Sequence, residues 1–222
     1  YWVTKNYREA YNMFACNGIL FNHESPRRAS NFVTTKVVKT AVEIKYGLAN
    51  KLILGNMDSH RDWGHSKDYV RAMHKIINHF EPDDFVVSTM ETHSVREMVN
   101  YVFTKLDLDV KKHLTQDAKF MRPEELKYLK GDSTKIRNIL NWQPEYCFES
   151  LLDDMINHWQ KTLINKNIYE TFDFAEFLKN NEKFEEAIFY YTNVLNIIWI
   201  CFFLAAFFTA LFKLVRMRLH TS

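Results

Sequence analysis

Glycine and cysteine are both scarce in this sequence, and each scarcity excludes a kind of site. The five glycines among 222 residues form no G-x-G-x-x-G pattern, so these residues contain no glycine-rich cradle for a dinucleotide. The three cysteines, Cys16, Cys147 and Cys201, are scattered and odd in number. They exclude a disulfide framework and predict buried thiols in a reducing compartment. The nine histidines are also dispersed, and we therefore expect no metal site.

Net charge is low as well. The formal net charge is +2 at pH 7, and the basic residues form no concentrated stripe, so we expect no nucleic-acid partner. The residues from Tyr1 onward are polar and aromatic and do not have the pattern of a secretory signal peptide. Hydrophobic residues make up 47% of the sequence, which is ample for a core. The length allows one domain, or one and a half.

Predicted helices and strands alternate along residues 1–159. Apolar periodicity predicts helices at 1–16, 34–46, 70–77, 94–103, 133–141 and 148–159. Short apolar runs predict strands at 19–21, 52–54 and 85–87. Ser94 and Glu97 have the spacing of a capping box at a helix start. The alternation predicts a mixed α/β domain.

The end of the sequence has a different character. Residues 187–212 include no charged side chain. As a helix this run would measure roughly 39 Å at about 1.5 Å per residue, enough to cross a hydrocarbon core of about 30 Å. We therefore predict a globular part at 1–165, a polar helical linker at 166–186, a transmembrane helix at 187–212 and a basic tail at 213–222. A buried hydrophobic helix is the alternative.

The densest polar run follows the predicted strand at 19–21. It contains an amide, an imidazole, a carboxylate, a hydroxyl and two guanidiniums, in the order Asn22-His23-Glu24-Ser25-Pro26-Arg27-Arg28. Open α/β sheets bind their ligands at the carboxyl ends of strands, and guanidinium groups match phosphate oxygens. The run therefore indicates a phosphate or nucleotide site, with a solvated turn as the alternative.

Further motifs follow this run in a fixed order. They are Asn31-Phe32-Val33-Thr34, Gly55-Asn56-Met57-Asp58, Arg61-Asp62-Trp63-Gly64-His65, His93-Ser94-Val95-Arg96-Glu97, Arg122-Pro123 with Glu125, Gly131-Asp132 with Lys135, and Asn141-Trp142 with Pro144. Together with the polar run, these motifs resemble the GDP-mannose 4,6-dehydratase family over residues 1–159.

The resemblance implies the C-terminal part of a Rossmann-type extended short-chain dehydrogenase, including its small substrate-binding portion. Such enzymes convert GDP-mannose to GDP-4-keto-6-deoxymannose, the first step toward GDP-fucose, while NADP takes hydride from the sugar and returns it. The resemblance implies NADP as cofactor, GDP-mannose as substrate and a cytoplasmic location, unless the apolar run anchors the chain to a membrane. A missing amino-terminal Rossmann half, or a second copy of the chain, is the expected protein partner.

The family's catalytic threonine, glutamate, tyrosine and lysine have no counterpart in the match. Tyr1 and Lys5 have the Tyr-x-x-x-Lys spacing, but matching Tyr1-Trp2 and Arg8 with its neighbours to the family places the true pair just upstream. We therefore assign no catalytic residue and expect the chain alone to be inactive. The alternative is a non-catalytic, membrane-attached nucleotide-sugar binding or interaction module, or the product of a decayed gene.

The resemblance also implies two groups of binding residues. Those expected at NADP are His23, Arg28 and Asn22. Those expected at the GDP part of the substrate are Lys36, Arg61, Arg122 and Glu125. For Arg61 the alternative is an ion pair with Asp62 or Asp68.

Three positions depart from the family pattern. Ala29 replaces the usual glycine after the double arginine, and Thr35 replaces a basic residue before Lys36. Met90 replaces the glycine of a Thr-Gly-Glu turn after the predicted strand at 85–87. A methionine there costs stability if the position needs positive φ.

Overall fold

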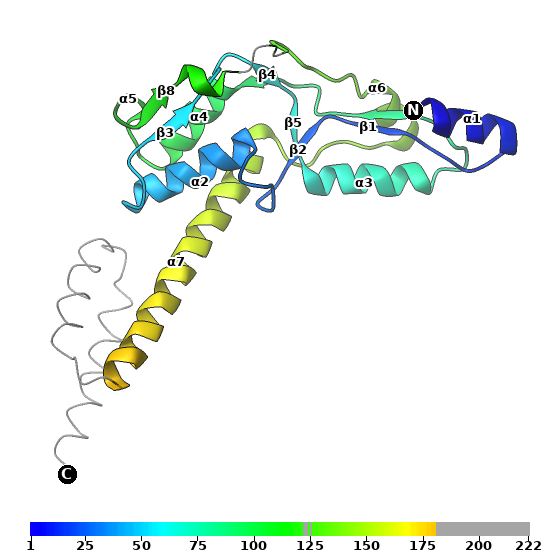
Figure 1. Ribbon diagram of the computed structural model, residues 1–222. Coiled ribbons are helices and arrows are strands. Elements are labelled where there is room, and N and C mark those ends of the chain that lie inside the picture. The colour runs from blue at the N-terminus through cyan, green and yellow to red at the C-terminus, as the bar shows by residue number, and fades with distance from the viewer. Residues whose placement is uncertain (122–123, 125, 181–222) are drawn as a thin grey trace. The chain divides into compact units, whose positions relative to one another are not determined.

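A computed structural model describes residues 1–121, 124 and 126–180. The chain divides into two compact units, residues 1–164 and residues 165–222. Figure 1 shows the alternating helices and strands of the first unit. The predicted membrane span at 187–212 and the basic tail lie outside the described residues. Within the part that the structure describes, no helix is long and apolar enough to cross a membrane.

Seven α-helices and one short 3₁₀ helix are described. The helices that build the cores are α2 (Val33–Lys45), α3 (Ser66–Ile77), α4 (Val95–Lys105), α6 (Thr134–Leu140) and α7 (Phe148–Asn180). The others are α1 (Trp2–Tyr11), α5 (Val110–His113) and the 3₁₀ helix η1 (Ala118–Phe120). The last helix continues past the predicted end at residue 159, to Asn180.

The described strands are short and pair two by two. Three pairs are parallel: β1 (Gly18–Leu20) with β6 (Phe85–Val87), β2 (Asn22–Glu24) with β5 (Trp63–His65), and β3 (Leu52–Leu54) with β8 (Leu114–Gln116). The fourth pair, β4 (His60–Arg61) with β7 (His93–Ser94), is antiparallel. Parallel strands connected through helices confirm the α/β class.

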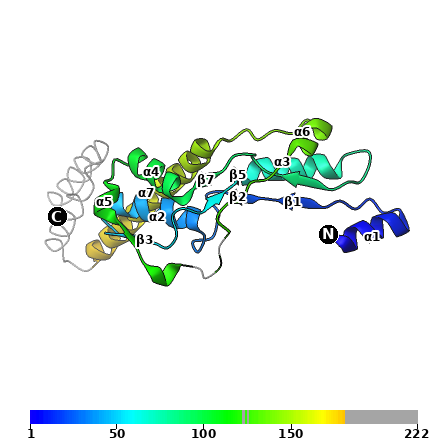
Figure 2. The ribbon, with the colours of Figure 1, turned by 90° about the horizontal axis from the view of Figure 1, so that it is seen from above.

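β1 and β2 follow one another almost without a break. Only Phe21 separates them, and Figure 2 shows the two strands in line, with α3 beside them. The predicted strand at 19–21 therefore begins and ends one residue later than the observed strand β1. The alternative of a solvated turn does not hold at the start of the polar run, because Asn22 to Glu24 form a second strand paired with β5.

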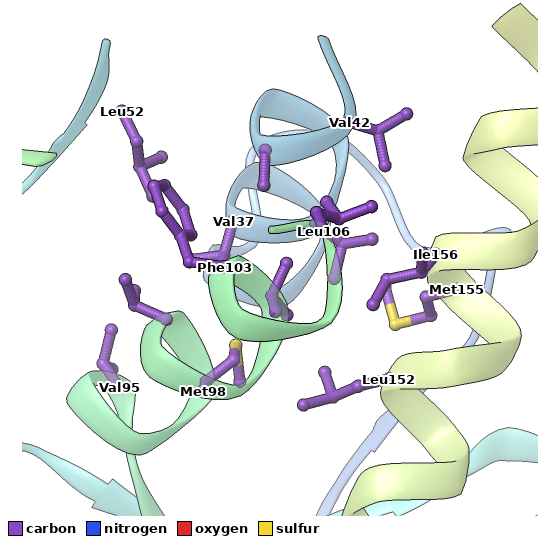
Figure 3. Packing of buried hydrophobic residues seen from close by; sticks show 14 of the residues in the cluster. Val37, Val42, Leu52, Val95, Met98, Phe103, Leu106, Leu152, Met155 and Ile156 are labelled. Carbon is purple, nitrogen blue, oxygen red and sulfur yellow. The ribbon is translucent and has the colours of Figure 1, made fainter. Parts of the chain in front are cut away.

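The larger hydrophobic core lies between α2, α4 and the first part of α7. Figure 3 shows side chains from these three helices pointing toward one another, among them Val42, Met98 and Met155. The apolar side predicted for the helix at 34–46 is buried, as expected. Ser94 and Glu97 form the predicted capping box, with Ser94 Oγ accepting from the Glu97 N–H at 3.1 Å.

A second core joins α3, β6 and α6. Tyr69, Ala72 and Ile76 of α3 pack here with Phe85 and Val87 of β6. The helix predicted at 70–77 rests on apolar positions Val70, Met73, Ile76 and Ile77. This apolar side was wrong in part, because Val70 is 61% exposed and Ile77 is 64% exposed. Tyr69 and Ala72 occupy the sheet side of the helix instead. Met73, expected on the apolar side of the same helix, and Ile139, expected on the buried side of the helix predicted at 133–141, are also exposed. The prediction of a buried thiol was wrong at Cys147, which is exposed.

Candidate functional site

The carboxylate of Glu24 organises the end of the polar run. Glu24 is 1% exposed, and its Oε2 accepts a hydrogen bond from Thr34 Oγ1 at 2.7 Å. The same oxygen lies 3.1 Å from Nε of Arg28. Burial raises the pKa of Glu24, while the Thr34 hydrogen bond and the Arg28 charge oppose that rise. Arg28 also lies over the ring of Phe32, 3.5 Å from its centroid, so two contacts fix this guanidinium.

His23 is fixed by different contacts from those of its neighbours. Its Nδ1 lies 2.8 Å from the carbonyl oxygen of Phe21, and its ring stacks on Tyr69 at a centroid distance of 4.8 Å. A carbonyl only accepts, so Nδ1 carries the proton in this contact and Nε2 is left as the acceptor of the neutral ring. Because side chains alternate along a strand, Asn22 and Glu24 leave one face of β2 and His23 leaves the other.

Lys36 and Arg61 reach one segment from two different elements. The Nζ of Lys36, on α2, lies 4.3 Å from the centroid of the Phe120 ring. Arg61, on β4, donates from Nη1 to the carbonyl oxygen of Leu126 at 2.6 Å. Phe120 and Leu126 both belong to the connection between β8 and α6. The structure therefore brings these two predicted substrate residues to a common segment.

Backbone contacts hold this segment in place. His60 donates its N–H to Lys127 at 2.8 Å, and its carbonyl oxygen accepts from the N–H of Leu129 at 3.1 Å. At the other end of the segment, a Cβ on Gly55 would lie 2.3 Å from the carbonyl oxygen of Phe120. Only glycine allows that approach. Arg122 and Glu125, the other predicted substrate residues, lie outside the described residues.

Asp62 is a buried acceptor that joins three parts of the chain. Its carboxylate accepts from the Thr89 N–H at 2.8 Å, the Thr89 hydroxyl at 2.7 Å, the Met90 N–H at 3.1 Å and the Gly131 N–H at 3.2 Å. These bonds tie the connection between β4 and β5 to the turn after β6 and to the start of the α6 region. Met90 has a φ of 68°, so the turn does hold a non-glycine residue in the left-handed region.

The two carboxylates proposed as alternative partners of Arg61 are engaged with other donors. Asp62 binds the turn after β6, as described above. Asp68 is fully buried and accepts from Arg71 Nη2 at 2.6 Å and from the Tyr146 N–H at 3.1 Å. Arg61 itself also donates to the carbonyl oxygen of its neighbour His60 at 2.8 Å.

Sequence reasoning missed the residues that position the site. Glu24, Tyr69 and Asp62 carry the contacts above, yet Glu24 and Tyr69 were assigned no role, and Asp62 was considered only as an alternative partner of Arg61. The i, i+4 spacing of Glu24 and Arg28 was a local signal for their ion pair. No local signal exists for Asp62, whose partners lie 27 to 69 residues away.

Comparison with known families gives a match over most of the chain. The family model described as GDP-mannose 4,6 dehydratase matches residues 1–155. GDP-mannose 4,6 dehydratase 1 of Arabidopsis thaliana is 48% identical over 157 residues, which cover 71% of this chain and 44% of that protein. GDP-mannose 4,6 dehydratase of Homo sapiens is 45% identical over 174 residues, covering 71% of this chain and 47% of that protein. The chain thus spans about half the length of the curated relatives it matches.

Solved structures confirm the fold at low sequence identity. RMD from Pseudomonas aeruginosa, solved with NADPH, has a TM-score of 0.65 at 20% identity, covering 72% of this chain and 52% of that one. The dTDP-glucose 4,6-dehydratase of Bacillus anthracis, solved with NAD, has a TM-score of 0.62, covering 72% of this chain and 49% of that one. With the family model matching residues 1–155, the chain belongs to the GDP-mannose 4,6-dehydratase family.

Proposed function

We propose that this chain is the substrate-binding half of a GDP-mannose 4,6-dehydratase. In this role Lys36 and Arg61 hold the GDP part of GDP-mannose, and Arg122 and Glu125 complete that site. The observation that carries the proposal is the convergence of Lys36 and Arg61 on the segment between β8 and α6, in a chain of this family.

The charges of this site suit a diphosphate. Lys36 lies in the first turns of α2, where the positive end of the helix dipole adds to its own charge. A guanidinium offers five N–H donors in a fork, so Arg61 can order the segment through Leu126 and present charge to a phosphate oxygen as well. The exposed ring of Phe120 lies beside the ammonium of Lys36 and offers an apolar surface for the nucleoside.

Three residues of the polar run are proposed to contact NADP. NADP, when bound, accepts hydride from the sugar and returns it. Within the described residues the terminal nitrogens of Arg28 make no hydrogen bond, and its Nε lies 3.1 Å from Oε2 of Glu24. His23 presents Nε2 as an acceptor, and Asn22 lies next to it on β2. The acid, the base and the phosphate cradle would come from the dinucleotide-binding half.

A second candidate function is a non-catalytic nucleotide-sugar-binding module. The left-handed conformation of Met90 favours it, because selection for a stable enzyme would retain glycine there. The two candidates share the GDP site and differ in whether a reconstituted protein turns over GDP-mannose.

Equilibrium binding of GDP to the full chain tests the shared site. We expect the wild-type chain to bind GDP, and Lys36→Ala or Arg61→Ala to weaken binding about tenfold each, roughly 1.4 kcal/mol. Lys105→Ala is the matched control, because Lys105 forms an ordinary exposed ion pair with Asp153. Equal affinity in all four proteins, or no binding of GDP by the wild type, would contradict the proposed site.

A further inference from the structure

The ring of Tyr69 covers one face of the His23 imidazole. The two rings are stacked at a centroid distance of 4.8 Å and an interplanar angle of 25°, within the geometry that aromatic pairs prefer. Tyr69 lies on α3 and is fully buried, whereas His23 lies on β2 and is partly exposed. The hydrogen bond from Nδ1 to the Phe21 carbonyl fixes one edge of the imidazole, and the stack fixes its plane. Nε2 is therefore held in one direction.

Gly64 provides the space that this stack needs. In the pairing of β2 with β5, Gly64 is the partner of His23. A Cβ on Gly64 would lie 2.4 Å from Cε2 of Tyr69 and 3.1 Å from its hydroxyl oxygen. Any side chain at this position would therefore push the Tyr69 ring away from the strand pair. The absence of a side chain opposite His23 is the steric condition for the contact between the two rings.

The main chain that carries Tyr69 is held close to the same two strands. α3 begins directly after β5, where Nδ1 of His65 accepts a backbone N–H at the helix start. The hydroxyl of Ser66 donates to the carbonyl oxygen of Glu24, the last residue of β2, at 3.0 Å. The Tyr69 ring also meets the Trp142 ring edge to face, at a centroid distance of 6.5 Å. These contacts fix the ring of Tyr69 in place beside His23.

The hydroxyl group of Tyr69 takes no part in this contact. It is buried and has no hydrogen-bond partner among the described residues. Burial and the charges of Asp62 and Asp68 raise the pKa of Tyr69, so the phenol stays neutral at physiological pH. Burying a hydroxyl without a partner costs stability, so this group does not stabilise the core. The aromatic face is the part of Tyr69 that acts on His23.

We propose that Tyr69 is a positioning residue, whose ring holds the His23 imidazole so that Nε2 is presented to NADP. The proposal rests on the proposed function, in which His23 contacts NADP. The tautomer follows from the Phe21 carbonyl, because only a protonated Nδ1 can donate to it. The orientation of the ring follows from Tyr69 and Gly64, since a stack allows little rotation about the side-chain torsion angles of His23. Tyr69 itself need not touch the cofactor.

A purely structural role is the alternative for Tyr69. The residue packs in the second core, together with Phe85 of β6. In a structural role, loss of the ring lowers stability and affects all parts of this core alike. In a positioning role, loss of the ring changes the His23 imidazole in particular. Phe85 separates the two roles, because it is a fully buried aromatic residue of the same core whose ring contacts His79 and Lys135 rather than His23.

Nuclear magnetic resonance of the full chain, isotopically labelled in its histidines and kept in mild detergent, provides the test. The His23 signals are identified by their absence from His23→Gln. In mildly alkaline buffer we expect Nδ1 to be protonated, Nε2 to be unprotonated, and the ring protons to be shifted upfield by the face of Tyr69. Tyr69→Phe should keep all three features. Tyr69→Leu should abolish the upfield shift and average the two nitrogen signals, because the imidazole then rotates away from the Phe21 carbonyl.

Two further variants separate positioning from misfolding. Phe85→Leu makes the matched aromatic-to-leucine change in the same core and should leave the His23 signals as in the wild type. Gly64→Ala keeps Tyr69 but displaces its ring, so it should reproduce the signals of Tyr69→Leu. Urea unfolding shows that each variant is folded, and Tyr69→Phe should be at least as stable as the wild type because it removes the unpaired hydroxyl.

Unchanged His23 signals in Tyr69→Leu, or the same change in Phe85→Leu, would overturn the proposal. A wild-type His23 ring without the upfield shift would overturn it as well, whichever variants fold.

Titration of NADP into the same samples connects the stack to the proposed function, because chemical shifts report even weak binding. We expect NADP to shift the Nε2 signal of the wild type. Tyr69→Leu should weaken the affinity, read from the NADP proton signals, about tenfold, near 1.4 kcal/mol. In the His23→Gln background, Tyr69→Leu should cause no further weakening, because it acts through His23. Equal weakening in both backgrounds would show that Tyr69 does not act through His23. If NADP leaves Nε2 of the wild type unchanged, the proposed function fails at His23, while the ring signals still decide the stack.

Discussion

At the scale of single residues, Met90 is a position where a departure from the family's sequence pattern can be compared directly with the backbone conformation. A methionine in place of the family's turn glycine predicted strain if the position needed positive φ, and its φ is 68°. Ala29 also replaces a glycine, but it is not among the described residues with positive φ. The two substitutions look alike in sequence but differ in consequence. Only Met90 lies in the left-handed region, where the Cβ of an L residue comes too close to a backbone carbonyl oxygen.

Met90→Gly is therefore expected to raise the free energy of unfolding by about 1 kcal/mol. Urea unfolding followed by circular dichroism measures the change. Met90→Ala is the control, since alanine keeps the Cβ that causes the strain and should give no such gain. If glycine and alanine shift the midpoint alike, the left-handed conformation is not the source of the cost.

Residue roles that depend on near neighbours were predictable, and roles that depend on distant ones were not. The capping box of Ser94 and Glu97 follows from spacing alone and is confirmed. The hydrogen bond from Thr34 to Glu24 and the bonds that Asp62 accepts require the folded chain, because no periodicity encodes them. For the same reason the sequence could propose Lys36 and Arg61 only through resemblance, and not show that they reach one segment.

At the scale of elements, the strands at 52–54 and 85–87 were predicted with their observed bounds, while the buried side of α3 was not. Periodicity indicates that a helix has an apolar stripe, but α3 has apolar residues on two sides. Contact with β6 selects Tyr69, Ala72 and Ile76, and leaves Val70 and Ile77 in solvent. Packing on the β1–β6 pair therefore decides which side of α3 is buried, and these two strands lie far apart in the sequence.

The attachment of α1 gives a prediction with a defined pH dependence. The hydrogen bonds from Arg8 hold the pKa of Asp84 well below its usual range, with Asn17 adding to the effect. A carboxyl whose pKa is lowered by folding stabilises the fold above its unfolded pKa of about 3.9, and this contribution is lost as pH falls through the lowered folded value. The tie between α1 and β6 should therefore hold at neutral pH and weaken only in strong acid.

Asp84→Asn should loosen α1 at neutral pH by about 2 kcal/mol, because it removes charge-assisted hydrogen bonds that are mostly shielded from solvent. Hydrogen exchange of the α1 amides, read by mass spectrometry, should then speed up about 30-fold. The difference between variant and wild type should shrink toward zero as pH falls below about 4. Glu9→Gln is the control, since it removes only the exposed pair with Lys5, 3.7 Å long, and should change nothing measurable.

At the scale of the whole molecule, one hydrophobic core lies around α2, α4 and α7, and a second lies between α3, α6 and the β1–β6 pair. Lys36 lies on a helix of the first core, and the residues proposed to contact NADP follow directly after β1. The glycines of these 222 residues form no G-x-G-x-x-G pattern.

The proposed function predicts that turnover by this chain requires a dinucleotide-binding half. We expect no conversion of GDP-mannose by the chain with added NADP. We expect conversion at least about 100-fold above that background in a complex with the dinucleotide-binding half of a relative, since positioned acid–base groups alone contribute about that factor. Lys36→Ala in the complex should raise KM with little change in kcat, because the diphosphate contact is made equally in the bound substrate and the transition state. Conversion by the chain alone would show that acid, base and hydride carrier are all held within it. A complex that binds GDP-mannose and NADP without converting the sugar would favour the non-catalytic module, and the strained turn at Met90 would then mark a fold kept for binding.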